Sequence, residues 1–489
     1  MSSLLTRRQL LAAPLTAPYV LRGAAQKLNV LMVAVDDLNN RIGCYGEPVV
    51  KTPNIDRLAR RGVRFDQAYC QYPLCNPTRT SLLSGLRPDA THVFDNNTPP
   101  RTYLKDHVFL PEYFKQNGYF TARVGKIAHG SYEHQIAWDI SESQAGRPIA
   151  QETRRLGDPD DMFERRKKKG TASGGGAKKA AGRRKAASGT GGIKLEWHAV
   201  DAKDSELPDG ATALRIAEIL EKSKDRPFFV GCGFHKPHLT WVAPKKYFDM
   251  YDPMKVILPD TPPDDRDDIP PIALTRTRGD EEMSELDKRK AVLAYHAATS
   301  FMDAQLGVLL DTMDRLGLWD NTVVLLFGDH GWHLNDHLGL WRKMTVFEEA
   351  ARAPLVVAAP GRKAGLGCPR LVEFIDIFPS FMELCGLPAP AWLEGTSFVP
   401  LLNDPQRMWK KAAFTQVIRP GKIMGRSVRT ERYRYTEWGN DKTIEFYDHE
   451  FDPKEWTNLA VRGNAASAKA MVEARQLLHT GWRAALPPG

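Results

Sequence analysis

The sequence predicts an α/β protein in which a mixed, mostly parallel sheet is sandwiched by helices, followed by a smaller C-terminal α+β subdomain of antiparallel sheet plus helix. Two observations favour this class. Apolar runs of strand length alternate with helix-like segments over most of the chain, whereas the C-terminal part alternates apolar and polar residues. A chain of 489 residues is long enough for both units. We expect the large domain at 26–404 and the subdomain at 405–489.

Four apolar, β-branched runs predict strands of the large sheet, and each run ends abruptly in polar residues. Continuous apolar strands suit a parallel sheet that is covered on both faces. The runs and the side chains that follow them are 28–35 with Asp36 and Asp37, 119–125 with Lys126 and His129, 227–234 with His235, and 322–328 with Asp329 and His330. Because ligands of such sheets bind at the carboxyl ends of the strands, we expect these side chains to converge on one pocket.

Helices are predicted between these strands, at 54–62, 110–118, 211–223 and 290–317. Gly62 and Gly118 end two of them, as glycine commonly does at helix C-termini. Strands that alternate with helices indicate βαβ units, which agrees with a mostly parallel sheet.

The pattern changes from about residue 405. Residues 422–453 alternate apolar and polar side chains, with a turn at 439–441, which is typical of an antiparallel meander. Residues 466–486 form an amphipathic segment that we expect to be a helix packed on this small sheet.

The net charge of +9 comes from one low-complexity segment, 165–192. That segment holds ten lysines and arginines and no acid, so the rest of the chain is close to neutral. We therefore expect no nucleic-acid partner. The segment itself is predicted to be a disordered insert in the large domain, or else a basic arm that gathers a polyanionic substrate.

The N-terminus resembles a twin-arginine export signal. Arg7 and Arg8 precede a short apolar stretch and the small residues Ala24 and Ala25, so residues 1–25 are predicted to be a signal peptide. No later run approaches the roughly 20 apolar residues of a membrane span. We expect an exported bacterial protein, periplasmic or extracellular.

The six cysteines are sparse for this length and contain no C-x-x-C pair. The pattern therefore indicates neither a zinc knuckle nor a disulfide-dense scaffold. Export would permit a disulfide, for which Cys368 and Cys385 are a conceivable pair.

One cysteine stands in the stretch "CNPTRTSLLSGLRP", residues 75–88. Pro77 suits the first position of a helix, Asn76 its cap, and Gly85 its end. Cys75 is then expected just ahead of a helix N-terminus, where free N–H groups favour an anion, with Arg79 reaching back towards it. A nucleophile beside an anion-binding site indicates transfer of a sulfuryl or phosphoryl group.

The stretch closely resembles the signature of the type I sulfatases of the alkaline phosphatase superfamily. Similarity to the iduronate-2-sulfatase branch runs from about residue 28 to 460, interrupted by the basic insert. It includes "VDDLNNRIGCYG", "VGKIAHG", "GFHKPH", "GDHGWHLNDH" and "SVRTERYRYTEW". The resemblance implies an alkaline-phosphatase-like fold and conversion of Cys75 to formylglycine by a formylglycine-generating enzyme. In its hydrated form this aldehyde attacks sulfur with one hydroxyl, and deprotonation of the other expels sulfate.

The acidic residues at the strand ends predict a metal site. Asp36, Asp37 and Asp329 would repel one another without a cation, and carboxylate oxygens suit a hard divalent ion. With His330 and Cys75 they are expected to hold one calcium ion. Many sulfatases have Asn at the place of His330, whereas the iduronate-2-sulfatase branch has His.

Two lysines and two histidines complete the predicted site. Lys126 and Lys343 would stabilise charge on the sulfuryl oxygens, although Arg342 could take the place of Lys343. The resemblance makes His129 the acid/base group near the diol and His235 the proton donor to the leaving oxygen, and these two roles could be exchanged. His238 and His337 are predicted to lie at the pocket mouth or, equally, on the surface, and His333 is given no role in the reaction.

The predicted reaction is hydrolysis of a sulfate ester. The resemblance to iduronate-2-sulfatases suggests that the substrate is the 2-O-sulfate of a uronic acid in a sulfated polysaccharide or oligosaccharide. An algal polysaccharide, another sulfated sugar or choline sulfate are alternatives. Two alternative functions are also consistent with the sequence. One is a phosphate mono- or diesterase of the same superfamily, and the other is a catalytically inactive protein that binds carbohydrate.

Overall fold

The computed structural model describes residues 27–143, 195–275, 283–439, 443–463 and 465–488. The predicted signal peptide and the basic insert at 165–192 lie outside these residues. No helix of the described part is long and apolar enough to cross a membrane.

A central eight-stranded sheet has the strand order β12-β2-β11-β8-β1-β6-β3-β4. All neighbouring pairs are parallel except those that β11 forms with β2 and β8. The predicted mixed, mostly parallel sheet is therefore confirmed. Its strands are β1 (Asn29–Val35), β2 (Val63–Tyr69), β3 (Phe120–Gly125), β4 (Ile140–Glu142), β6 (Phe228–Phe234), β8 (Thr322–Gly328), β11 (Leu355–Ala358) and β12 (Leu366–Glu373).

Helices cover both faces of this sheet, because successive side chains of each buried strand point to opposite sides. In β1, residues 30, 32 and 34 pack on α2, α4, α12 and α13, whereas residues 31, 33 and 35 pack on α1, α7 and α9. The bounds are α1 (Pro53–Arg61), α2 (Cys75–Ser84), α4 (Leu110–Gln116), α7 (Pro208–Ser223), α9 (Glu285–Leu316), α12 (Ile377–Leu384) and α13 (Val399–Asn403).

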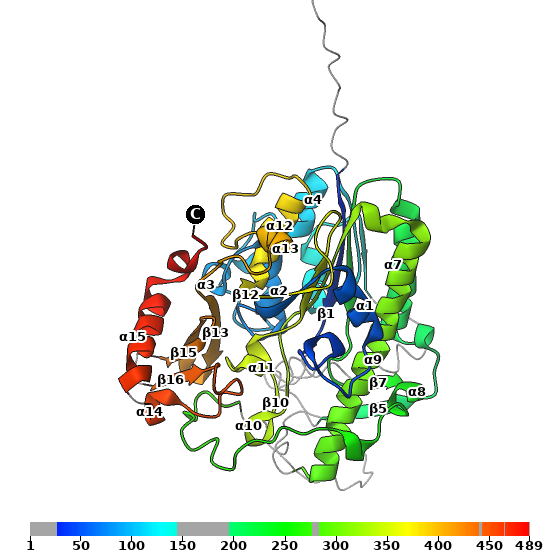
Figure 1. Ribbon diagram of the computed structural model, residues 1–489. Helices are drawn as coiled ribbons and strands as arrows, with labels where there is room; N and C mark the ends of the chain where they lie inside the picture. The colour runs from blue at the N-terminus through cyan, green and yellow to red at the C-terminus, as the bar shows by residue number, and fades with distance from the viewer. Residues whose placement is uncertain (1–26, 144–194, 276–282, 440–442, 464, 489) are drawn as a thin grey trace, which may run out of the picture.

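Short elements occur in the connections. They are the helices α3 (Pro88–Thr91), α8 (Lys245–Phe248), α10 (Asp336–Gly339) and α11 (Glu348–Ala351), the parallel pair β5 (Trp197–Val200) and β7 (Trp241–Pro244), and the antiparallel pair β9 (His333–Asn335) and β10 (Leu340–Arg342). β9, α10, β10 and α11 follow β8, and the chain then returns to the central sheet at β11. In Figure 1, α10, β10 and α11 lie between the C-terminal elements and α9.

The C-terminal part is a four-stranded antiparallel meander covered by a helix, as predicted. Its elements are β13 (Ala413–Arg419), β14 (Ile423–Arg429), β15 (Tyr433–Trp438), β16 (Thr443–Asp448), α14 (Leu459–Arg462) and α15 (Ala465–Thr480). α15 packs on β14 and β15 through a small core that includes Val428, Tyr435 and Ala474. Of the predicted turn, Gly439 is described, and residues 440–441 lie outside the described part. The division at residue 404 stays a prediction.

The expected start of α2 is wrong. The helix begins at Cys75, with Leu74 in an extended conformation before it. Asn76 is not its cap, because the loop around 95–98 folds over this end. The backbone N–H of Asn76 donates to Oδ1 of Asn96, and the Asn76 side chain donates to the Asp95 and Thr98 carbonyl oxygens. The helix does end at Gly85, which has a φ of 73°.

The cysteine pairing that the sequence left open does not form. All six cysteines are free thiols. The Cys368 sulfur faces the carbonyl oxygen of Pro405, and the Cys385 sulfur faces that of Leu28.

Candidate active site

The central strands bring the predicted side chains together at their carboxyl ends. β8, β1, β6 and β3 are adjacent and parallel, so the segments after them lie at one edge. The backbone N–H of Asp36 donates to the Phe234 carbonyl at 3.1 Å, and that of Asp329 to the Val35 carbonyl at 3.1 Å. Gly233 permits the approach of the β3 end, because a Cβ there would lie 2.2 Å from the carbonyl oxygen of Lys126.

Cys75 is fully buried at the start of α2. Its sulfur lies 3.0 Å from Nζ of Lys343 and 3.4 Å from Nε2 of His330. Burial, and then the charge of Asp36, raise the pKa of the Cys75 thiol well above its ordinary value, although Lys126 and Lys343 act in the opposite direction. The thiol is therefore neutral, and a neutral thiol is a weak nucleophile.

Arg79 links three strand ends, and the charge of Cys75 is among those that act on it. Its Nε donates to Oδ2 of Asp329 at 2.9 Å, and Nη2 donates to Oδ1 of Asp36 at 3.1 Å. Nη1 donates to the carbonyl oxygen of Lys126 at 2.6 Å. The side chain is completely enclosed, so its charge acts on the two carboxylates without screening by water.

The three buried carboxylates fit a hard cation. Ligand oxygens of Asp36, Asp37 and Asp329 lie within 4.8 Å of one another, and Cys75, Asp329 and His330 form an overlapping group of the same size. Within the described residues, Oδ2 of Asp37 has no hydrogen-bond partner. A buried carboxylate oxygen without a donor is costly, and a divalent ion would satisfy it.

Cations compensate part of this negative charge. Nζ of Lys126 donates to Oδ2 of Asp36 at 2.6 Å, and Nζ of Lys343 donates to Oδ1 of Asp37 at 2.7 Å. Burial alone would raise the pKa of Asp36, but Lys126, His238 and Arg79 hold it well below its ordinary value. The Asp36 carboxylate is therefore ionised, as a metal ligand must be.

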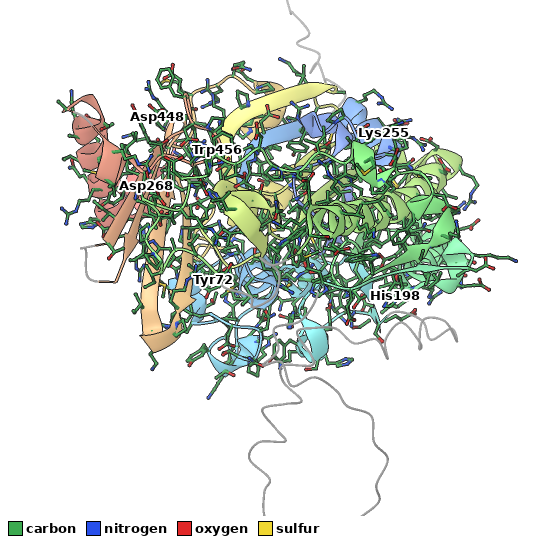
Figure 2. The ribbon with its side chains drawn as sticks, turned by 90° about the horizontal axis from the view of Figure 1, so that it is seen from below. Tyr72, His198, Lys255, Asp268, Asp448 and Trp456 are labelled. Atoms are coloured by element: carbon green, nitrogen blue, oxygen red, sulfur yellow. The ribbon has the colours of Figure 1, made fainter. Side chains whose placement is uncertain are left out.

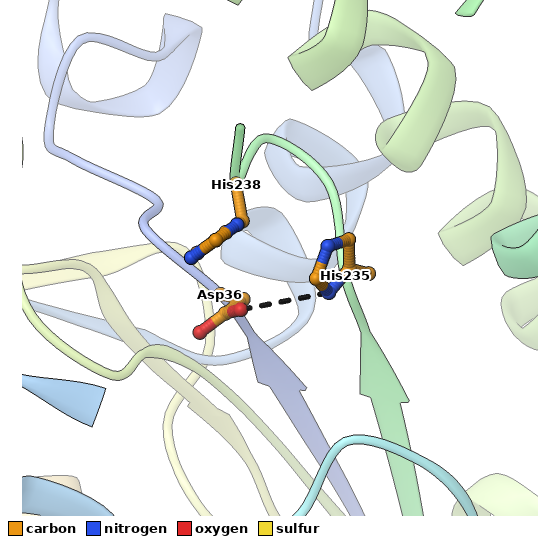
Figure 3. Close-up of side chains that lie close together, drawn as sticks. All are labelled: Asp36, His235 and His238. Atoms are coloured by element: carbon orange, nitrogen blue, oxygen red, sulfur yellow. Dashed lines mark ion pairs between the residues drawn. The ribbon is translucent and has the colours of Figure 1, made fainter. Parts of the chain in front are cut away.

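His235 and His238 flank the aspartates from the loop after β6. Figure 3 shows both rings beside Asp36, with Nδ1 of His235 at 3.7 Å from Oδ2 of Asp36. Nε2 of His238 lies 3.7 Å from Oδ2 of Asp37, and the two rings are 4.9 Å apart. Burial, Lys236 and His238 lower the pKa of His235 well below its ordinary value, so its imidazole is neutral at pH 7.

His129 is also buried, and it precedes the short 3-10 helix Gly130–Gln135. Its ring lies 6.2 Å from that of Tyr132. Its role beside Cys75 stays a prediction.

His238, His333 and His337 are all buried, so the surface alternative for His238 and His337 is wrong. His238 lies in the cluster, because its ligand nitrogen is within 4.8 Å of Asp37 and Cys75 ligand atoms. His333 pairs with Oγ1 of Thr345 at 2.7 Å and His337 with Asp265 at 3.2 Å. The signal for His238 was its proximity to His235 in the sequence.

Asp209, at the start of α7, was not singled out from the sequence. Its two carboxylate oxygens accept the backbone N–H groups of His235 at 2.9 Å and Lys236 at 2.8 Å. In sequence it looks like any acidic residue in a first helical turn. Asp209 fixes the direction in which the chain leaves β6.

Known proteins are similar to this chain over the residues that form the site. The sulfatase family model matches residues 28–387, and the model of the C-terminal part of N-sulphoglucosamine sulphohydrolase matches 330–480. A sulfatase of Formosa agariphila is 33% identical, over 92% of this chain and 86% of its own. Iduronate 2-sulfatase of Mus musculus is 30% identical, over 86% of this chain and 87% of its own.

Solved structures share the fold. A 2-O GAG sulfatase superposes with a TM-score of 0.70 at 23% identity and covers 93% of this chain and 92% of its own. The phosphonate monoester hydrolase of Agrobacterium radiobacter superposes with a TM-score of 0.74 at 22% identity, with 94% and 96% covered.

Proposed function

Because the chain belongs to the sulfatase family, we propose that it hydrolyses sulfate esters, with the 2-O-sulfate of a uronic acid in a sulfated polysaccharide or oligosaccharide as substrate. One observation carries the reaction class: Cys75 is held at the start of α2 between Lys343 and His330, beside three buried carboxylates. The substrate class rests on similarity to iduronate 2-sulfatases and to a 2-O GAG sulfatase.

Cys75 acts as formylglycine in this proposal, after oxidation by a formylglycine-generating enzyme. The neutral, buried thiol is a weak nucleophile, which supports a modified side chain. One hydroxyl of the hydrated aldehyde attacks sulfur, and the bond between sulfur and the leaving sugar oxygen breaks. Loss of a proton from the second hydroxyl then re-forms the aldehyde and expels sulfate, so that one hard displacement becomes two easier steps.

Asp36, Asp37, Asp329 and His330 would hold one calcium ion together with the modified Cys75. A bound divalent ion supplies charge stabilisation for oxygen atoms that become negative during the reaction. The oxygen-rich ligand set favours calcium over zinc.

Lys126 and Lys343 would supply the positive charge that a sulfuryl group next to Cys75 needs. Nζ of Lys343 contacts Sγ of Cys75, and the charges of both lysines act on that thiol. By the resemblance, His235 would donate a proton to the leaving sugar oxygen, whereas its lowered pKa leaves the imidazole neutral at pH 7 and so favours the role of base. His129 would take the proton from the second hydroxyl. The reverse assignment of the two histidines satisfies the same chemistry.

Release of sulfate from a panel of esters tests the substrate. We expect turnover of an uronate 2-sulfate disaccharide and little or none of glucosamine 6-sulfate, choline sulfate or a phosphonate monoester. Turnover of glucosamine 6-sulfate without the uronate 2-sulfate would contradict the substrate proposal. Faster turnover of the phosphonate would favour the phosphoesterase alternative, since the fold also superposes on a phosphonate monoester hydrolase. No turnover of any ester by protein with formylglycine would favour an inactive carbohydrate-binding protein.

The twin-arginine-type N-terminus supports export to the periplasm or the medium. Fractionation of cells that express the full chain, and of cells that express it with Arg7 and Arg8 both replaced by Lys, tests this. Retention of only the variant in the cytoplasm is the expected result, and equal distribution of both would contradict it.

A further inference from the structure

Asp36 and Asp37 are neighbours in the chain, yet their carboxylates belong to one cluster. Both residues lie in the turn that follows β1, and ligand oxygens of both come within 4.8 Å of one another and of Asp329. Successive side chains of an extended strand point to opposite sides, so a straight continuation of β1 would separate the two carboxylates. The chain therefore has to turn at this point.

The backbone of Asp37 has a φ of 60°. This is the left-handed region, which residues with a side chain adopt at a cost in free energy, although aspartate tolerates it better than most. Such a conformation persists where the surrounding structure holds it. The direction of the Asp37 carboxylate therefore depends on the contacts that hold its backbone.

Both backbone groups of Asp37 are held by side chains from other elements. Its N–H donates to Oδ1 of Asp329 at 3.0 Å, and its carbonyl oxygen accepts the hydroxyl of Tyr295 at 2.8 Å. Asp329 is itself a predicted metal ligand, whereas Tyr295 belongs to α9 and lies 258 residues away in sequence. Tyr295 is therefore a contact that holds Asp37 independently of the other ligands.

The same hydroxyl also accepts the backbone N–H of Asn39 at 2.8 Å. A tyrosine hydroxyl donates one hydrogen and can accept as well, so this one oxygen bridges the carbonyl of Asp37 and the N–H two residues later. Nδ2 of Asn39 donates to the carbonyl oxygen of Trp332 at 2.9 Å. These bonds join the turn after β1 to the segment after β8, which carries two more of the predicted ligands.

Tyr295 is itself fixed by packing. Its side chain is completely buried, in an apolar cluster that includes Leu239, Trp241 and Trp332. The ring of Trp241 meets it edge-on, with the ring centres 5.9 Å apart. Because buried side chains are closely packed, the hydroxyl is a rigid point of attachment for the turn.

We propose that Tyr295, together with Asn39, positions Asp37 as a ligand of the metal ion. The Tyr295 hydroxyl holds the left-handed turn that brings the Asp37 carboxylate beside those of Asp36 and Asp329, and Asn39 ties this turn to the segment after β8. Neither side chain supplies a ligand atom, so both act through Asp37. The inference rests on the proposed metal site and does not depend on which ester is hydrolysed.

Calorimetric titration of calcium into the metal-free protein tests the proposal. Tyr295→Phe keeps the ring in its cluster and removes only the hydroxyl. We expect the dissociation constant for calcium to rise about tenfold or more, as is typical when a side chain that orients a metal ligand is lost. Asn39→Ala should also weaken binding. Asp37→Ala should abolish it, which assigns the measured heat to this site.

Tyr251→Phe is the matched control, because it also removes a hydroxyl that accepts a backbone N–H and contacts α9. The Tyr251 hydroxyl accepts the N–H of Lys51 at 2.9 Å and pairs with Ser300. It lies away from the metal site: Figure 2 shows Lys255, four residues after Tyr251, apart from Tyr72, which precedes the nucleophile by three residues. We expect wild-type affinity for calcium in this control.

Thermal unfolding separates the positioning role from a loss of stability. Without metal, both Phe variants should melt below the wild type, since each loses hydrogen bonds. Calcium should then raise the melting temperature of the wild type and of Tyr251→Phe by the same amount. It should raise that of Tyr295→Phe by less, because stabilisation by a ligand follows its affinity for the folded state.

Three results would overturn the proposal. They are equal calcium affinity in Tyr295→Phe and the wild type, equal weakening in Tyr251→Phe and Tyr295→Phe, and no calcium binding to the wild type. If Tyr295→Phe does not fold, unchanged affinity in Asn39→Ala would overturn it. None of these measurements uses hydrolysis, so a wild type that binds calcium but hydrolyses no ester would contradict the proposed function alone.

Discussion

The ammonium group of Lys343 lies 3.0 Å from the sulfur of Cys75. The same group donates to Asp37 at 2.7 Å, so one lysine contacts both the predicted nucleophile and a predicted metal ligand. Its chain segment follows β10, more than 250 residues after Cys75 in sequence. Lys343 is thus the cation best placed to stabilise charge on a sulfuryl group attached at position 75.

Replacement of Lys343 by Met should remove this charge while keeping most of the side-chain volume. We expect kcat to fall about 100- to 1,000-fold, because an electrostatic contact of the transition state is lost. Steady-state kinetics with a sulfate ester checks this. Lys245→Met is the control, since Lys245 is exposed and pairs with Asp249 on the surface. A Lys343→Met enzyme with wild-type kcat would show that the lysine has no part in the reaction.

Asp209→Asn should disturb the direction of His235 without touching its ring. The amide has one acceptor oxygen, so one of the backbone N–H groups of His235 and Lys236 loses its partner. We expect kcat to fall about tenfold or more through misplacement of the imidazole, with a smaller change in KM.

The pH profile separates this role from a loss of stability. Burial raises the pKa of Asp209 to about 6, although the two backbone hydrogen bonds act to lower it. Below pH 6 the carboxyl gains a proton and one acceptor site is lost, so the rate of the wild type should fall there. The Asn variant should lack this fall. If the rates of the wild type and of the Asn variant fell in the same way below pH 6, a positioning role of Asp209 would be contradicted.

Removal of the metal by a chelator should abolish turnover and lower the melting temperature, because Asp36, Asp37 and Asp329 would then repel one another. We expect calcium to restore both properties better than zinc. Activity assays and thermal unfolding with each ion measure this. Better recovery with zinc would indicate a site more like that of a phosphatase.

Acid should weaken the attachment of the C-terminal sheet to the central body. Burial alone would raise the pKa of Glu455, but Arg434 and then His449 lower it to about 2. Arg434 donates to Glu455 and also to Glu348 of α11. Because the pKa of Glu455 is lowered in the folded state, its stabilisation is present above about pH 4.5 and is lost as the pH falls towards 2.

Unfolding in urea at pH 6, 4 and 3 measures this effect. By pH 3 the wild type should lose part of a contribution of about 3 kcal/mol, the size that this pKa difference implies. Glu455→Gln should be less stable at pH 6 and less sensitive to acid. A variant with the same pH dependence as the wild type would assign the acid response to other carboxyl groups.

The strands, their mostly parallel arrangement and the convergence of their polar ends could be predicted from the sequence, because period and order along the chain determine them. The positions of the strand ends predicted that Asp36, Asp329 and Lys126 lie close together. In the structure Lys126 donates to Asp36, and Asp329 accepts from Arg79. The resemblance also identified Lys343, which no periodicity marks.

Other features depend on contacts that the sequence does not display. The cap of α2 was missed because residues 95–98, from a different loop, take the place of Asn76. The burial of His238 depends on the path of the chain after β6, which Asp209 fixes through backbone hydrogen bonds. Neither contact leaves a pattern in composition or spacing.

The mass of the peptide that contains Cys75 tests the central claim most directly. The protein should be produced in a host that has a formylglycine-generating enzyme, and a portion should be produced in one that lacks it. We expect a mass that corresponds to an aldehyde in place of the thiol in the first case and an unmodified thiol in the second, with sulfate-ester hydrolysis only in the first. An unmodified thiol in both, together with unchanged hydrolysis, would contradict the proposed nucleophile.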